Sequence, residues 1–222
     1  QKKISWWGEN KSKRLPSGHL VSSQIHCLNH LFALRKDDIA IKAIIENATG
    51  LKIKEVYPAP FDKDGGFISF EFVCKNKSLL DEKYETRGAN CTSIDALVYI
   101  QTTDGRKLLI PIEWKYTETY QSKEAEESSL ERYPKLIDSE SNLKKWCDLY
   151  KADPYYELMR QSLLMEQIIK KNEISEIEAV GYRHIMVIPN AHVELKNAIE
   201  EKYISNLKDN SKFCIIDPQS LL

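Results

Sequence analysis

The sequence predicts an α/β fold in which a mixed central sheet is flanked by helices. Two observations support this fold class. Helical and strand-like periodicities alternate along the chain in the order helix, helix, strand, strand, strand, helix, strand, helix, strand. The three successive strands are typical of an antiparallel meander, and the helix that follows them is typical of a crossover to a further strand of the same sheet.

The helices are predicted from apolar residues at helical spacing and from the residues that cap them. Ser22 or Ser23 is suited to cap the first helix, Asp37 the second, and Gly50 ends the second. A long amphipathic pattern indicates the third helix, and a similar pattern near the C-terminus indicates the fourth. The four predicted helices span residues 22–35, 37–50, 155–171 and 191–207.

The strands are predicted from alternating or continuous apolar runs between turn residues. Asp104-Gly105 is a strong hairpin signal and joins the second and third strands. Pro111 inside the third strand is unusual, because proline lacks the donor of a sheet ladder, and it suggests a sheet edge or a bulge. The predicted strands span residues 65–74, 94–101, 107–117, 181–190 and 213–218.

Length and composition indicate one domain. The 222 residues are 42% hydrophobic, which is typical of a single globular unit over 1–222. Residues 1–21 form an irregular N-terminal arm, and the polar, weakly periodic stretch 119–152 is an insertion of loop and short helix. Asp153 and Pro154 then provide the N-cap and the first position of the third helix.

Net charge, hydropathy and cysteine spacing indicate which partners and which cellular location to expect. The chain has 32 basic and 33 acidic residues, so its net charge of −1 favours no particular polyanionic partner. No apolar run approaches the ~18–20 residues of a membrane span, and the first residues lack the apolar core of a secretory signal. The five cysteines are scattered and never form a C-x-x-C pair, which indicates free thiols. The expected location is therefore cytoplasmic, without a membrane partner.

The predicted hairpin carries charged residues inside otherwise apolar strands. Alternation places Glu113 and Lys115 on one face of their strand, and Asp95 lies in the preceding strand. Pairing through Asp104-Gly105 brings the two carboxylates near each other at the same open end of the sheet. A solvated hairpin face with a Lys–Glu pair would also explain these charges, but such faces carry charges throughout, whereas these cluster at one end.

Two close carboxylates repel each other unless a cation lies between them. Mg²⁺ prefers oxygen ligands and typically needs one or two protein carboxylates, with waters and phosphate oxygens completing its shell. Such an ion lowers the pKa of a bound water and polarises a phosphoryl oxygen. A lysine on the same face is suited to stabilise developing charge or to orient the attacking water. The pattern therefore indicates cleavage of phosphodiester bonds.

The segments "SIDALVYI" and "IPIEWKYTE" resemble the Asp…Glu-x-Lys core of the PD-(D/E)XK nuclease superfamily, which has the restriction-endonuclease-like fold. The resemblance implies Asp95 and Glu113 as metal ligands, Lys115 as the catalytic lysine, and the backbone carbonyl of Trp114 as a further ligand. One departure is that Ile94, and not a proline, precedes Asp95. The resemblance further implies Mg²⁺, or Mn²⁺ in its place, and DNA as the substrate.

Enzymes of this superfamily often act as homodimers that cut both strands, so a homodimer is a further expectation. Two alternatives compete with the nuclease hypothesis. The first is a non-catalytic nucleic-acid-binding module on the same fold, although the intact Asp95, Glu113 and Lys115 argue against it. The second is a scaffold whose charged face is incidental.

The resemblance also suggests residues around this core. The superfamily often adds an acid, for which Glu71 is favoured over Glu46 because Glu71 lies on the sheet. Arg87, Arg160 and Gln161 are candidate substrate contacts, since an arginine can hold a phosphate through two hydrogen bonds. An ion pair between Arg160 and Glu157, an acid of its own helix, is an equal alternative for that arginine.

Two histidines on the first helix form a weaker candidate site. His26 and His30 are four residues apart, a spacing that can bind a metal ion. The helix lacks the intervening glutamate of a zinc protease, so a structural role for both histidines is the favoured interpretation. No phosphate-binding or dinucleotide-binding glycine motif and no G-x-S-x-G is present, which disfavours an NTPase, a dinucleotide enzyme and an α/β-hydrolase.

Overall fold

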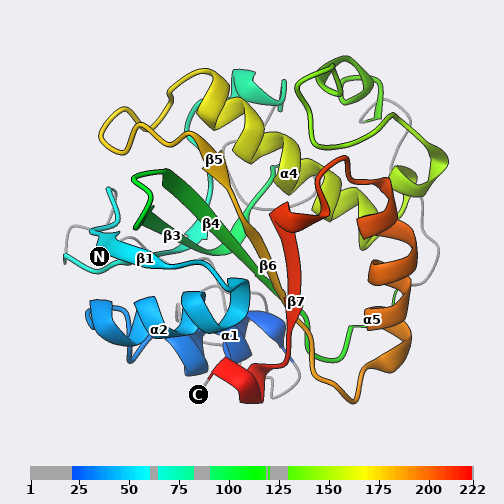
Figure 1. Cartoon of the computed structure of the whole chain (residues 1–222). Helices are drawn as coiled ribbons and strands as arrows, with labels where there is room; N and C mark the ends of the chain where they lie inside the picture. The colour runs from blue at the N-terminus through cyan, green and yellow to red at the C-terminus, as the bar shows by residue number, and fades with distance from the viewer. Residues whose placement is uncertain (1–21, 61–64, 83–90, 119, 121–129, 222) are drawn as a thin grey trace, which may run out of the picture.

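The protein is built around one mixed sheet of seven strands with helices on both faces, as the sequence predicts (Figure 1). The computed structural model describes residues 22–60, 65–82, 91–118, 120 and 130–221. The main path of the sheet is β1-β3-β4-β6-β7, with β2 beside β3 and β5 beside β4. The strands are β1 (Ile53–Tyr57), β2 (Ile68–Phe72), β3 (Ile94–Thr102), β4 (Lys107–Trp114), β5 (Gly181–Tyr182), β6 (His184–Val187) and β7 (Phe213–Ile216).

The sheet has an antiparallel half and a parallel half. Strands β1 and β2 both pair antiparallel with β3, and β3 pairs antiparallel with β4. The chain then crosses over through α4, after which β5 and β6 pair parallel with β4, and β7 pairs parallel with β6. This arrangement matches the predicted meander followed by a helical crossover.

The first two helices begin, and the second ends, where their predicted capping residues indicate, whereas the first helix ends at Leu31 and not at residue 35. The hydroxyl of Ser22 accepts a hydrogen bond from the N–H of Ile25, and Asp37 accepts one from the N–H of Ala40 at 2.9 Å. Gly50 ends the second helix with φ +69°, a left-handed conformation that glycine adopts without strain. The α-helices are α1 (Ser23–Leu31), α2 (Asp38–Thr49), α4 (Tyr155–Lys170) and α5 (Val193–Ala198).

Each face of the sheet is covered by its own hydrophobic core. Helices α1 and α2 lie on one face, and α4 and α5 lie on the other (Figure 1). Because both faces are covered, β3 and β4 are buried almost along their whole length. The core beneath α1 and α2 includes Leu31, Ile45, Val98, Ile110 and Trp114. The core beneath α4 and α5 includes Leu97, Tyr99, Leu109, Leu163 and Leu195.

Several predicted boundaries are wrong. Strand β1 was not predicted, and the predicted strand 181–190 is divided into β5 and β6. Pro154 occupies the N-cap position of α4, so Asp153, the predicted cap, lies one residue before the observed one. The predicted helix 191–207 is α-helical only over α5. It continues as a π-helical turn and a 3₁₀ turn, η4 (Ile199–Tyr203) and η5 (Ile204–Asn206).

Pro111 lies in the middle of the sheet, so the expected edge or bulge is wrong. Its strand is flanked by β3 on one side and by β5 and β6 on the other, and its register with β3 is continuous. The N–H of Arg183 donates to the carbonyl of Leu109 at 2.9 Å. In a parallel ladder the carbonyl of Arg183 would next accept from position 111. A proline there has no N–H to donate, and this is where β5 ends and β6 begins.

The described part of the predicted insertion contributes to the core beneath α4. This part includes the short 3₁₀ helices η2 (Pro134–Leu136) and η3 (Asp148–Lys151). Its buried apolar residues in this core are Tyr133, Leu143 and Tyr150. The predicted N-terminal arm lies outside the described residues. Three further 3₁₀ helices are η1 (Lys77–Leu79), η6 (Asn210–Lys212) and η7 (Pro218–Leu221).

In the described part of the chain, no helix has the length and apolar character that crossing a membrane requires. The described sulfhydryls at all five cysteine positions are free, as their spacing predicts.

Candidate active site

The hairpin of β3 and β4 brings the two predicted carboxylates to adjacent positions. Ala96 pairs with Ile112 in the register of the two strands. One further step in this register places Asp95 opposite Glu113. Both side chains are almost fully buried, with 7% and 3% of their residues' surfaces exposed. Their neighbours on the same faces of the two strands, which lie in the core beneath α4, are Leu97, Tyr99 and Leu109.

Hydrogen bonds and an ion pair hold this group of side chains together. The backbone N–H of Trp114 donates to Oδ2 of Asp95 at 2.9 Å. Oε1 of Glu113 lies 2.6 Å from Nζ of Lys115, and Oε2 accepts from Nε2 of Gln161 at 2.6 Å. Lys115 is itself only 6% exposed. The structure therefore brings Asp95, Glu113 and Lys115 into one buried cluster on one face of the sheet.

In this cluster several carboxylates lie close to the single ammonium of Lys115, and they shift each other's pKa and that of the lysine. Burial raises the pKa of Glu113 well above its ordinary value, and the negative charges of Asp95 and Glu157 raise it further. Burial works to lower the pKa of Lys115, but the carboxylates of Glu113 and Glu157 more than offset it, so that pKa is raised well above its ordinary value. Lys115 therefore remains a cation at neutral pH.

The donor atoms fit a divalent cation that is completed by water and substrate. Within the described residues, no three His, Cys, Asp or Glu side chains form a ready-made metal site. Asp95 and Glu113 supply two carboxylates, which is the number that Mg²⁺ typically takes from a protein. Burial raises the pKa of Glu113 most, and the negative charge of Asp95 adds to this effect. A cation between the two carboxylates would compensate this negative charge.

The side chains of the two candidate extra acids are bonded to groups outside this carboxylate pair, although the register of β2 and β3 places position 71 opposite Asp95. Glu71 has a left-handed backbone, with φ +48°, and its Oε1 accepts from Nε2 of Gln24 at 2.9 Å. Gln24 belongs to α1, which covers the opposite face of the sheet. Oε1 of Glu46 accepts from the N–H of Ile53 at 2.7 Å. Ile53 pairs with Thr102, at the turn end of the hairpin, so Glu46 lies at the far end of the sheet.

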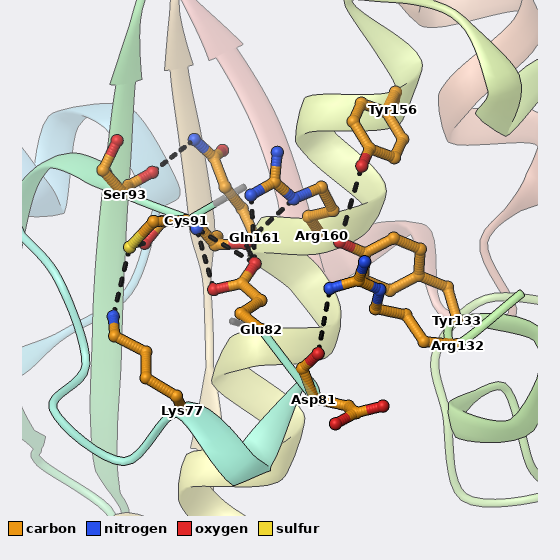
Figure 2. A network of polar contacts seen from close by, with 11 residues as sticks. Lys77, Asp81, Glu82, Cys91, Ser93, Arg132, Tyr133, Tyr156, Arg160 and Gln161 are labelled. Carbon is orange, nitrogen blue, oxygen red and sulfur yellow. Dashed lines mark hydrogen bonds and ion pairs between the residues drawn. The ribbon is translucent and has the colours of Figure 1, made fainter. Parts of the chain in front are cut away.

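Arg160 is held by a buried network rather than by an acid of its own helix (Figure 2). Its Nη2 donates to Oε1 of Glu82, and its Nε donates to the hydroxyl of Thr92, both at 3.0 Å. The N–H of Thr92 in turn donates to both carboxylate oxygens of Glu82. The network ties the chain that enters β3 to α4. Arg87, the other predicted phosphate contact, lies outside the described residues.

Gln161 connects the same helix to both strands of the hairpin. Its Nε2 donates to the carbonyl of Ser93 at 3.1 Å, as Figure 2 shows, and to Glu113. Its Oε1 is buried and has no hydrogen-bond partner among the described residues. Sequence reasoning placed Gln161 near the substrate but missed its contact with Glu113. It also missed the contact between Glu157 and Lys115. The sequence signal for both contacts was the i, i+4 spacing of Glu157 and Gln161, which places these two residues on one face of α4.

The two histidines of α1 support the hairpin from its other face. The ring of His26 stacks on Tyr116 with centroids 3.5 Å apart, and the ring of His30 lies 4.9 Å from that of Trp114. These contacts favour the structural role expected for both histidines. The Trp114 side chain is fully buried on this face, and its predicted role as a backbone ligand stays a prediction.

Comparison with known proteins gives a family for the chain. No curated protein and no solved structure matches the chain significantly. A protein family described as Restriction Endonuclease associating with ARP matches residues 2–222. The match spans nearly the whole sequence, including both hairpin strands and α4. The chain therefore belongs to the family of restriction endonucleases associating with ARP.

Proposed function

We propose that this protein is a nuclease that hydrolyses phosphodiester bonds of DNA with the help of a divalent cation, Mg²⁺ or Mn²⁺. Asp95 and Glu113 would hold the cation together with the backbone carbonyl of Trp114, and Lys115 would be the catalytic lysine. The observation that carries the proposal is the buried pair of opposed carboxylates with an ammonium 2.6 Å from one of them. The restriction-endonuclease family of the chain supports a nuclease role.

The chain's own residues orient the reacting groups. The Trp114 N–H fixes the rotamer of Asp95 from the neighbouring strand, and Gln161 fixes that of Glu113 from α4. A bound divalent cation would supply a water of lowered pKa and would polarise a phosphoryl oxygen. In the cation-free protein Lys115 is a positive charge, because Glu113 and Glu157 raise its pKa well above its ordinary value. Its ammonium would stabilise the negative charge that develops on the phosphoryl group.

Cleavage of plasmid and single-stranded DNA with Mg²⁺, with Mn²⁺ and with a chelator tests this proposal. We expect cleavage by the wild type only with a cation, and a loss of about 100-fold or more for Lys115→Ala, as for other groups that stabilise transition-state charge. Lys107→Ala is the matched control, because Lys107 lies on the same strand but pairs with the exposed Glu178.

Two outcomes would decide against catalysis by these residues. Equal cleavage by the wild type and by Lys115→Ala would remove Lys115 from the mechanism. Cation-independent DNA binding without cleavage by the wild type would favour the non-catalytic module.

A further inference from the structure

A third carboxylate reaches the cluster from the first turn of α4. Oε2 of Glu157 lies 2.5 Å from Nζ of Lys115, which is also paired with Glu113. We infer that Glu157 is a positioning residue, which remains ion-paired with Lys115 when Glu113 binds a divalent cation. This inference rests on the proposed function, because it concerns the same cation.

The three side chains form a path from the protein interior to its surface. The exposed fractions of the side chains are 4% for Glu113, 7% for Lys115 and 36% for Glu157. Glu113 is therefore the inner acceptor of the ammonium, and Glu157 is the outer one. The outer acceptor is also rigidly placed, because it lies one helical turn before Arg160 and Gln161, which anchor α4 to the chain entering β3.

The net charge of the cluster matches that of one divalent cation. Asp95, Glu113 and Glu157 are three acids around the single ammonium of Lys115, which leaves two negative charges when all are ionised. Arg160 does not reduce this excess directly, because its own guanidinium is paired with Glu82 at 3.0 Å. One doubly charged ion would bring the four-residue cluster to neutrality.

A cation held through Oε1 of Glu113 would compete with the ammonium of Lys115 for that oxygen. Nζ of Lys115 lies 2.6 Å from Oε1 of Glu113, so a cation that binds this oxygen must displace it or be repelled by it. With Glu157 present, Lys115 gives up one carboxylate and keeps another that is already at bonding distance. Without Glu157, a cation that displaced Lys115 from Glu113 would leave the buried ammonium without an ion-pair partner. An unpaired buried ammonium is unfavourable, so cation binding would be weaker.

A double-mutant cycle on the substrate-free protein tests the inference. Mn²⁺ affinity is measured by calorimetry for the wild type, Glu157→Gln, Lys115→Met and the double variant. We expect Glu157→Gln to weaken Mn²⁺ binding by about tenfold, which is within the usual coupling between contacting residues. In the Lys115→Met background the same substitution should leave the affinity unchanged, because the ammonium that Glu157 holds is gone.

Controls separate a positioning role from a general effect of charge. Glu55→Gln removes one exposed negative charge from β1, opposite Gln101 at the turn end of the hairpin, and should not change Mn²⁺ affinity. Thermal melting of each metal-free variant verifies that it is folded. At saturating Mn²⁺ we expect Glu157→Gln to lower kcat for DNA cleavage, with KM nearly unchanged, since the misplaced group is Lys115.

The outcomes distinguish this inference from the proposed function. If Glu157→Gln weakened Mn²⁺ binding equally with and without Lys115, Glu157 would act as a direct ligand or through its negative charge alone. That result would overturn this inference but not the proposed function. Unchanged affinity in Glu157→Gln would also overturn only this inference. A folded wild type that does not bind Mn²⁺ at all would overturn both.

Discussion

The backbone N–H of Trp114 donates to Oδ2 of Asp95 across the hairpin, at 2.9 Å. This bond ties the first predicted metal ligand to the strand that carries the other two residues of the cluster. A backbone donor cannot be removed by mutation of its side chain, so the position of the carboxylate follows from the register of β3 and β4. That register is set by the tight turn at Gly105, which has φ +91°.

Asp95→Asn removes the charge of this carboxylate and keeps an oxygen that can accept from Trp114. We expect the variant to remain folded, with a melting temperature equal to or above that of the wild type, because the repulsion with Glu113 is relieved. Cation-dependent cleavage should fall by more than the roughly 10- to 100-fold that follows loss of a residue supporting a metal ligand. Wild-type cleavage by this variant would show that Asp95 holds no catalytic cation.

Gln161→Leu removes the donor that serves both Glu113 and the carbonyl of Ser93. Each buried acceptor left without a donor costs about 1–3 kcal/mol, so we expect the free energy of unfolding to fall by about 2 kcal/mol or more. Cleavage should fall as well, because the Glu113 rotamer is no longer fixed. Urea unfolding and a cleavage assay measure the two effects.

Gln167→Leu is the control for this substitution. It changes the same residue type in a buried position of α4, about 9 Å further along the helix axis. We expect it to leave cleavage unchanged. Equal loss of cleavage in the two variants would show that Gln161 acts through the helix as a whole and not through Glu113.

The hairpin and its cluster could be predicted from sequence because their determinants are local. The Asp104-Gly105 turn sets the register, and alternation then places Asp95 and Glu113 together. Strand β1 was missed because its five residues show no clear alternation, with buried positions only at its first and fourth residues. Its place in the sheet depends on pairing with β3, which lies more than forty residues away in sequence.

The partners of the candidate site residues could not be predicted, because they depend on the tertiary fold. Arg160 pairs with Glu82, 78 residues away, although an acid of its own helix was the expected alternative. Glu71 lies in β2, as predicted, but its left-handed backbone accompanies a side chain that is bound to Gln24 of α1. Strand alternation assumes an extended backbone, so it gives the wrong direction at such a residue.

Arg160→Met tests whether this arginine is structural or contacts DNA. Removing one partner of a buried ion pair leaves the other charge unpaired, so we expect the free energy of unfolding to fall by about 3 kcal/mol. Adding Glu82→Gln should restore part of this loss, because the glutamine is neutral and still accepts from Thr92. Denaturant unfolding of the single and double variants measures both effects.

A phosphate contact by Arg160 would give a different result. Stability would change little, and DNA affinity would fall together with its dependence on salt concentration. Binding titrations at two salt concentrations, on variants shown to be folded, distinguish this outcome from the structural one.

His184 makes the stability of the fold depend on pH. The residue is fully buried, and neither ring nitrogen has a hydrogen-bond partner among the described residues. Burial, and to a lesser extent the charge of Lys115, lowers its pKa from 6.5 to about 3. Between pH 6.5 and pH 3 the unfolded chain binds a proton at His184 and the folded chain does not. The contribution of neutral His184 to the free energy of unfolding is therefore complete above pH 6.5 and falls as the pH drops toward 3.

His184→Leu removes this titration and replaces an unbonded imidazole with an apolar side chain of similar size. Between pH 7.5 and pH 5 we expect the wild type to lose about 2 kcal/mol more of its free energy of unfolding than the variant does. Urea unfolding of both proteins at the two pH values measures the difference. Parallel losses in the two proteins would mean that His184 is protonated in the folded state, which would require an acceptor or a water beside its ring.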